Sequence, residues 1–263
     1  MKVKGKRIIV TGAARGIGRE LTLELLKKGA FVIALDINED ALSELSGIAK
    51  DEKLQTYTVD VASNESLADF KKEYFLNNAT VDGLINNAGI IQPFINVNEL
   101  DMDIVNKVMN INFFGPFKLT KLFLNELMKR DCAHIVNVSS MGGFFPFPGQ
   151  TIYGASKAAL KLFTEGLFAE LLDTNVGVTI VFPGAIATDI AKNSNVKMTL
   201  SSDSVKNYKM LSPVIAAREI ISAMEKNKFQ VYVGSDSKFM NFMYKMNPKK
   251  AIKMISKKMK LMK

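Results

Sequence analysis

A serine, a tyrosine and a lysine stand at spacings that could carry out acid–base chemistry. Ser140 precedes Tyr153 by thirteen residues, and Lys157 follows Tyr153 by four. Residues i and i+4 of a helix share one face, so the phenol and the ammonium can reach the same site. Tyrosine is a poor base, with a pKa of about 10, but a nearby ammonium stabilises phenolate and lowers that pKa. The set predicts proton transfer by Tyr153, with Ser140 donating a hydrogen bond to the substrate oxygen.

Ser139 stands beside Ser140 at the end of a predicted strand. Neighbouring side chains of a strand point to opposite faces, so we expect only one of the two serines to meet the substrate. Because a tyrosine and a lysine at this spacing also occur by chance, the other motifs of the chain decide the interpretation.

A glycine-rich segment follows the first apolar run, Ile8–Val10. Glycines let the backbone turn tightly and approach a pyrophosphate, and a helix that begins there directs its free N–H groups at the anion. An ordinary glycine-rich turn is the structural alternative. The segment predicts cofactor contacts at Gly12, Arg15, Gly16, Ile17 and Gly18.

Asp36 closes the second apolar run and bears on the choice of cofactor. An acid there can accept hydrogen bonds from the adenosine ribose and repels the 2′-phosphate of NADP. Ile37 follows it, not a base, whereas Arg15 could contact that phosphate. We weigh the acid more heavily and favour NAD, with NADP as the alternative; a helix cap or a solvated acid is the structural interpretation of Asp36.

Two polar segments follow the third and fourth predicted strands. The first could meet the adenine edge, and the second has the small residues and carboxamides that suit a backbone lying against a cofactor. Ordinary turns are the structural alternative. These segments predict cofactor contacts at Asp60, Val61, Asn87, Ala88 and Gly89.

Short β-branched runs alternate with longer helical stretches along the chain. This alternation predicts right-handed βαβ units and an α/β, doubly wound (Rossmann) parallel sheet, with ligands bound beyond the carboxyl ends of the strands. The expected strands lie near residues 8–10, 31–35, 55–59, 84–85, 134–138, 176–182 and 230–233. The expected helices lie near residues 15–28, 39–49, 63–77, 101–129, 151–173 and 213–226.

Taken together, these motifs resemble the short-chain dehydrogenase/reductase family over about residues 5–235. The matching residues are Thr11-Gly12, Gly16-Ile17-Gly18, Asp36, Asp60, Asn87-Ala88-Gly89, Asn112, Ser140, Tyr153, Lys157, Pro183-Gly184 and Thr188. The resemblance implies a single seven-stranded parallel sheet in the order 3-2-1-4-5-6-7, and a homodimer or homotetramer.

The resemblance also implies a catalytic tetrad. Tyr153 would be the general acid/base, and Lys157 would lower its pKa and hold the nicotinamide ribose. Ser140 would polarise the carbonyl or alcohol, and Asn112 would position a water in a proton relay. The remaining implied cofactor contacts follow the sixth strand, at Pro183, Gly184, Ile186 and Thr188.

The expected reaction is interconversion of a secondary alcohol and a ketone. The apolar loop Phe144–Pro148 and the methionine-rich later segments suggest a small apolar or lipid-like substrate, although the loop could instead pack internally or against a subunit. An NADP-linked 3-oxoacyl or carbonyl reductase is the enzymatic alternative. A dinucleotide-binding sensor or scaffold without turnover is the other alternative, and the intact serine, tyrosine and lysine argue against it.

The rare residue types exclude other chemistries. With one histidine, His134, and one cysteine, Cys132, both a zinc dehydrogenase site and a Ser-His-Asp triad lack parts, so we expect no metal site and a structural role for His134. One cysteine forms no internal disulfide, and no apolar run is long enough for a signal peptide or a membrane span. We expect a cytoplasmic protein.

The net charge of +9 is carried by residues 238–263, which hold nine lysines and no acid. The remaining residues hold equal numbers of acids and bases, which disfavours a nucleic-acid-binding face. We therefore divide the chain into a catalytic domain, 1–237, and a basic amphipathic extension, 238–263. Its helically spaced apolar residues, Ile252, Ile255, Met259 and Met262, suggest contact with an anionic membrane; packing on its own body or on a partner subunit is the alternative.

Overall fold

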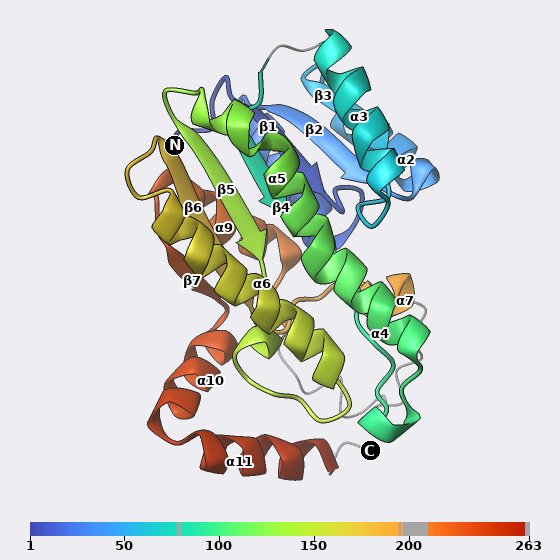
Figure 1. Cartoon of the computed structure of the whole chain (residues 1–263), viewed down its shortest axis with the longest axis vertical. Helices are drawn as coiled ribbons and strands as arrows, with labels where there is room; N and C mark the ends of the chain where they lie inside the picture. The colour runs from blue at the N-terminus through green and yellow to red at the C-terminus, as the bar shows by residue number, and fades with distance from the viewer. Residues whose placement is uncertain (78–79, 195, 197–209, 261–263) are drawn as a thin grey trace.

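The chain folds around one parallel β-sheet in a computed structural model that describes residues 1–77, 80–194, 196 and 210–260. The sheet has seven strands in the order β3-β2-β1-β4-β5-β6-β7, and each strand runs parallel to its neighbours (Figure 1). This arrangement confirms the doubly wound fold expected from the sequence.

The strands are short and largely apolar. They are β1 (Arg7–Thr11), β2 (Phe31–Asp36), β3 (Leu54–Thr58), β4 (Gly83–Asn86), β5 (Ala133–Val138), β6 (Val176–Pro183) and β7 (Gln230–Val233). Every residue of β4 and β5 is buried. Strands covered on both faces lose the alternation of polar and apolar residues, which explains the continuous apolar runs in the sequence.

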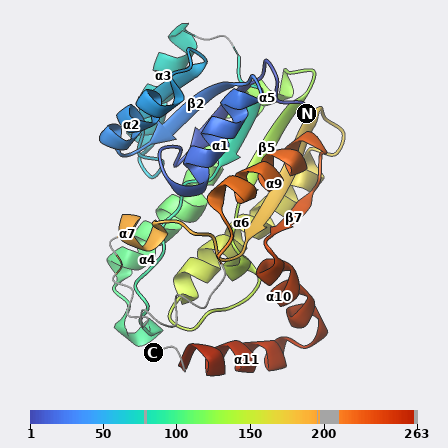
Figure 2. The ribbon, with the colours of Figure 1, turned by 180° about the vertical axis from the view of Figure 1, so that it is seen from behind.

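Helices cover both faces of the sheet, as Figures 1 and 2 show from opposite sides. One face carries α1 (Gly16–Lys27), α2 (Glu39–Ala49) and α9 (Pro213–Glu225). The other carries α3 (Asn64–Asn77), α5 (Gly115–Met128) and α6 (Thr151–Glu170). Further α-helices of the described residues are α4 (Met102–Met109), α7 (Ile190–Asn193), α10 (Ser235–Met246) and α11 (Pro248–Lys260). Within the described residues, no helix is long and apolar enough to span a membrane.

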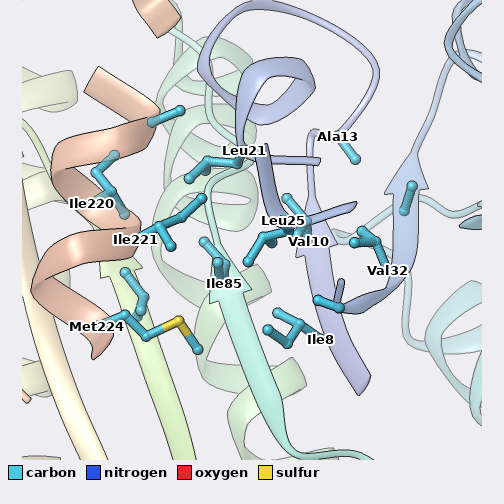
Figure 3. Packing of buried hydrophobic residues seen from close by; sticks show 14 of the residues in the cluster. Ile8, Val10, Ala13, Leu21, Leu25, Val32, Ile85, Ile220, Ile221 and Met224 are labelled. Atoms are coloured by element: carbon cyan, nitrogen blue, oxygen red, sulfur yellow. The ribbon is translucent and has the colours of Figure 1, made fainter. Parts of the chain in front are cut away.

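The packing of α1 against α9 fixes the start of α1 above the sheet (Figure 3). Leu21 and Leu25 of α1 meet Ile220 and Ile221 of α9, over Ile85 of β4, and all five side chains are fully buried. Burying each such side chain contributes about 1.5–3 kcal/mol. The glycine-rich loop before α1 is thereby held at the carboxyl end of β1.

The prediction of one continuous helix over residues 101–129 is wrong, because a π-helical turn, Asn110–Phe114, separates α4 from α5. Pro116 explains the interruption. A proline has no N–H, so the α-helical hydrogen bond from residue 116 to the carbonyl of Asn112 cannot form. π-helical turns often mark functional sites, and this one contains Asn112.

His134 lies buried on β5. Its Nε2 lies 2.8 Å from Thr179 Oγ1, and that hydroxyl donates to the carbonyl of Lys228. The imidazole Nε2 therefore donates to the threonine oxygen. Burial lowers the pKa of His134 to about 3, so the ring is neutral at physiological pH. These contacts fit the structural role expected for His134.

Two glycines make a matched test of the loop geometry. A Cβ on Gly18 would collide with the carbonyl oxygen of Gly12, whereas a Cβ on Gly47 of α2 would meet nothing within 4 Å. We expect Gly18→Ala to lower the free energy of unfolding by about 1–3 kcal/mol, as overpacked sites do. Gly47→Ala should raise it by about 0.5–1 kcal/mol through helix propensity. Denaturant unfolding of both variants measures the difference, and equal effects would contradict the close approach at Gly18.

Candidate active site

A cavity of about 480 Å³ opens at the carboxyl ends of the strands. Ligand sites typically enclose about 300–1,000 Å³, and in open α/β sheets they lie at this edge. Most of the residues predicted from the sequence line it: Gly12, Arg15, Gly16, Ile17, Asp36, Asp60, Val61, Asn87, Ala88, Gly89, Ser140, Tyr153, Lys157, Pro183, Gly184, Ile186 and Thr188. The two others, Gly18 and Asn112, lie buried behind the lining.

The glycine loop leaves its backbone open to the cavity. Gly12 and Gly16 have φ angles of 61° and 54°, in the left-handed region that favours glycine. A Cβ on Gly12 would lie 2.9 Å from Ala88 Cα. Arg15, at the N-cap of α1, offers no side-chain hydrogen bond to the first turn. The first N–H groups of α1 are therefore suited to an anion.

Hydrogen bonds join the glycine loop to the segment after β4. Thr11 Oγ1 accepts from the backbone N–H groups of Asn87 and Ala88, both at 3.0 Å. Asn87 Nδ2 donates to the carbonyl of Thr11 at 2.9 Å. These bonds hold two predicted cofactor-binding segments side by side.

Asp36 and Arg15 lie on the same part of the lining but have different partners. Asp36 Oδ2 accepts from Ala14 N at 3.0 Å, and its Oδ1 accepts from Asn38 N at 3.1 Å. Arg15 is exposed, and its Nη1 donates to Asn193 Oδ1 of α7 at 3.1 Å. Two backbone N–H groups thus fix the Asp36 carboxylate, whereas the Arg15 guanidinium is held by the side chain of Asn193 at the surface.

Asp60 and Val61 occupy the lining beyond β3. Asp60 Oδ1 accepts from Ala62 N at 2.8 Å, which turns the chain toward α3. Val61 packs against Gly115, where an added Cβ would approach Val61 Cγ2 to 3.1 Å. Gly115 therefore lets α5 lie close to this edge of the cavity.

Lys157 projects from α6 into the interior. Its side chain is 4% exposed, and its Nζ donates to the carbonyl of Val138, at the end of β5, at 3.0 Å. Burial lowers the pKa of Lys157 to about 8. The lysine remains mostly charged at neutral pH and titrates within reach of physiological conditions.

Ser140 and Ser139 face different ways, as expected. Ser140 Oγ accepts from Gly142 N at 3.0 Å and faces Tyr153, whose pKa its hydroxyl lowers. Ser139 Oγ instead donates to the carbonyl of Lys157 at 2.8 Å. One serine thus joins the tyrosine, and the other anchors α6.

The expected lowering of the Tyr153 pKa is not found. Burial raises the pKa of Tyr153 above its ordinary value of 10.0, and the hydrogen bond from Ser140 lowers it by less. Desolvation disfavours phenolate, and this outweighs the effect expected from Lys157, whose ammonium donates to Val138 O. The structure therefore holds Tyr153 as a neutral phenol that can donate a proton.

Asn112 is fully buried in the π-helical turn, and its side-chain amide is occupied. Its Oδ1 accepts from Ile90 N, and its Nδ2 donates to Ile90 O, both at 2.9 Å. The same Nδ2 donates to Ser156 Oγ on α6 at 3.0 Å. The side chain thus clamps the segment after β4 against α6, and its expected role in a water relay stays a prediction.

The profile of the family described as short chain dehydrogenase matches residues 6–199. The chain belongs to the short-chain dehydrogenase/reductase family. It is therefore an oxidoreductase that acts on CH–OH groups, as expected from the sequence.

Relatives and solved structures agree with this assignment. The chain is 35% identical over 196 residues to the 3-oxoacyl-(acyl-carrier-protein) reductase FabG of Thermotoga maritima, covering 73% of this chain and 78% of that one. It is 32% identical over 244 residues to the dehydrogenase/reductase SDR family member 7B of Bos taurus, covering 87% and 73%. A short-chain dehydrogenase of Burkholderia cenocepacia, solved in complex with NADP, is 26% identical, with a TM-score of 0.81 and coverage of 97% and 99%.

The sequence suggested that the loop Phe144–Pro148 contacts the substrate, but in this dehydrogenase the loop does not border the cavity. Phe144 packs on Phe182 and Tyr232, with ring centroids 5.3 and 5.5 Å away, and Phe145 packs on Tyr244 at 5.8 Å. Among the described residues, the cavity lining includes none of this loop. Internal packing, the alternative left open by the sequence, accounts for these rings. Apolar residues that do line the cavity include Ile90, Ile91, Ile111 and Ile190.

Gln92 is a buried residue of this dehydrogenase that the sequence reasoning missed. Its Oε1 accepts from the backbone N–H groups of Ile152 and Tyr153, at 2.7 and 3.0 Å, in the first turn of α6. Its Nε2 donates to Gly149 O at 3.0 Å, and the backbone carbonyl of Gln92 accepts from Gln150 Nε2 at 2.7 Å. The only signal of this role in the sequence is the polar side chain of Gln92 directly after the apolar Ile90 and Ile91.

We expect Gln92→Ala to lower kcat about 10–100-fold while the KM for the cofactor changes little. Loss of its acceptor frees the backbone that carries Tyr153, and small misplacements of reacting groups can slow a reaction about 100-fold. Steady-state kinetics measure the split between kcat and KM, and Gln230→Ala, a glutamine on β7, is the control. Unchanged kcat in a folded Gln92→Ala protein would show that Gln92 does not position Tyr153.

Proposed function

We propose that this enzyme interconverts a secondary alcohol and a ketone, with NAD as the favoured cofactor and a small apolar or lipid-like substrate. One observation carries the proposal. Ser140, Tyr153 and Lys157 line the cavity that the glycine loop also lines, and the Ser140 hydroxyl is near enough to Tyr153 to lower its pKa.

The residues around the cavity fit a nicotinamide dinucleotide. The glycine loop and the first turn of α1 would hold the pyrophosphate, Asp36 the adenosine ribose, and Asp60 and Val61 the adenine edge. When bound, the cofactor supplies the acceptor or donor of the hydride. The segments after β4 and β6 would hold its nicotinamide half, through Asn87, Ala88, Gly89, Pro183, Gly184, Ile186 and Thr188.

Tyr153 is proposed to hold and move the proton. Its raised pKa keeps the phenol protonated, ready to donate to the oxygen of a ketone, while Ser140 polarises that oxygen. Alcohol oxidation needs the phenolate. Lys157 is proposed to stabilise it and to hold the nicotinamide ribose, and Asn112 to position a water that relays the proton.

The apolar side of the cavity supports an apolar substrate. Ile90, Ile91 and Ile111 line the same cavity as Ser140, Tyr153 and Lys157. Transferring apolar surface out of water favours binding by about 25 cal/mol per Å².

An NADP-linked 3-oxoacyl or carbonyl reductase is the second candidate. The identity with the Thermotoga maritima reductase favours it, and Arg15 at the rim could contact a 2′-phosphate. A dinucleotide-binding sensor or scaffold is the third, and the intact site of Ser140, Tyr153 and Lys157 argues against it.

We further propose that the protein works in the cytoplasm as a homodimer or homotetramer. Phe117 of α5 and Leu162 of α6 are exposed apolar side chains that a partner subunit could cover. The division into a catalytic domain, 1–237, and an extension, 238–263, is also a proposal, with the extension contacting an anionic membrane.

Replacement of Tyr153 tests the mechanism. We expect Tyr153→Phe to lower kcat about 10²–10⁴-fold, as loss of a general acid does, with both NAD(H) and NADP(H). In the unaltered enzyme, ketone reduction should weaken and alcohol oxidation should strengthen as pH rises, because the pKa of Tyr153 is raised. Nicotinamide absorbance during turnover of apolar alcohols and ketones measures both. Tyr57→Phe, on β3, is the control, and equal turnover in the two variants would refute the mechanism.

Replacement of Asp36 tests the cofactor preference. We expect the unaltered enzyme to bind NADH more tightly than NADPH, and Asp36→Ser to shift the ratio of the two dissociation constants about tenfold or more toward NADPH, a change of ~1.4 kcal/mol. Asp40→Ser, an exposed acid on α2, is the control. Tighter NADPH binding by the unaltered enzyme would overturn the preference for NAD and favour the second candidate.

A further inference from the structure

Residues 235–260, which include the described part of the basic extension, form two helices at the end of the molecule where the cavity opens. In Figures 1 and 2, α10 and α11 lie together beyond the carboxyl end of β5, and α10 follows directly from β7. The carboxyl ends of the strands carry Ser140, Pro183 and the other lining residues.

The start of α10 is bonded to the cavity wall. Asp236 Oδ2 accepts from Ala185 N at 2.7 Å, and Ala185 lines the cavity. Ser237 Oγ is buried and donates to Phe182 O of β6 at 2.8 Å. A surface that binds α10 would therefore also fix the position of the cavity relative to that surface.

The inner faces of both helices pack on the body. Met240, Ala251 and Ile255 are buried in one cluster with Met141 and Phe145 of the loop that follows Ser140. Of the expected apolar stripe of α11, Ile255 and Met259 pack inward together with Ala251, whereas Ile252 is exposed. Met262 lies outside the described residues. The packing of the extension on its own body, one of the sequence alternatives, is present.

The outer face of α10 remains apolar even so. Phe239, Phe242 and Met246 are 52%, 59% and 69% exposed, and their spacing places them on one side of the helix. Single exposed apolar side chains are ordinary, but two phenylalanines and a methionine on one helical face form a patch.

The positive charge around this patch favours a negatively charged partner. Residues 238–263 hold nine lysines and no acid. Lys238, Lys245, Lys249 and Lys253 are exposed beside the patch or on α11. Exposed aromatic rings flanked by lysines are typical of helices that lie in the interface of an anionic membrane.

We infer that the outer face of α10 and the lysines of α10 and α11 bind an anionic phospholipid surface, with Phe239 and Phe242 inserted. Because α10 is bonded to Ala185, binding holds the cavity beside the lipid, from which an apolar substrate can enter. This second step rests on the proposed reaction, whereas the docking makes specific the membrane contact proposed for the extension and does not depend on the reaction.

Sedimentation with vesicles tests the docking. The full-length protein is mixed with phosphatidylcholine vesicles that contain or lack phosphatidylserine, at about 0.1 M salt, where charges act over about 10 Å. We expect binding at least about tenfold stronger with phosphatidylserine. The double variants Phe239→Ser/Phe242→Ser and Lys249→Glu/Lys253→Glu should each lose about tenfold or more.

Matched variants elsewhere on the surface serve as controls. Ile48→Ser/Leu76→Ser removes two exposed apolar side chains from α2 and α3, and Lys27→Glu/Lys226→Glu reverses two exposed lysines near the ends of α1 and α9. Both should bind vesicles like the unaltered protein. All four double variants should retain turnover of a water-soluble substrate, because none changes a residue of the site.

Equal binding to both kinds of vesicle, or losses as large in the controls, would overturn the docking. So would light scattering that shows Phe239→Ser/Phe242→Ser dissociating an oligomer with vesicle binding unchanged, since the face would then be a subunit contact. Tyr153→Phe separates the two proposals: it should bind vesicles normally, so its loss of turnover tests the reaction alone.

Discussion

The buried ammonium of Lys157 is the constraint on which the site depends. Removing a charge from water costs several kcal/mol unless partners compensate, and here the carbonyl of Val138 accepts from Nζ. The backbone carbonyl of Lys157 in turn accepts from Ser139 Oγ. Two bonds therefore join α6 to the carboxyl end of β5. Ser140 and Tyr153 come together as a consequence, one just past Val138 and the other one turn before Lys157.

Other elements secure the same arrangement from the opposite side. Gln92 accepts from the first N–H groups of α6, and Asn112 bonds both Ile90 and Ser156. Both residues attach the segment after β4, which lines the cavity, to the helix that carries Tyr153. The cavity is thus shaped by tertiary bonds between segments that are distant in the sequence, and the glycine loop is held to it through Thr11.

The sequence predicted what local patterns determine. Apolar runs without alternation located the buried strands, and the glycine loop and Asp36 followed directly from strand ends. The sequence did not predict effects of tertiary packing. Burial raises the pKa of Tyr153, and Phe145 packs on Tyr244 of a helix that is distant in the sequence. The interruption of the long helix was also missed, although Pro116 could have predicted it, because its missing N–H breaks the hydrogen-bond ladder at Asn112.

The central proposal is that Tyr153 is a neutral phenol in the free protein, able to donate a proton, and that bound oxidised cofactor stabilises its phenolate, the form that accepts a proton from an alcohol. NMR titration of protein labelled with ¹³C at the tyrosine ring carbon that bears the hydroxyl measures this directly, with the Tyr153→Phe spectrum assigning the resonance. We predict a Tyr153 pKa above 10 in the free protein and a lower one with NAD⁺ bound, because positive charge stabilises phenolate. A Tyr153 resonance whose pKa is unchanged by saturating NAD⁺ and NADP⁺ would contradict the account.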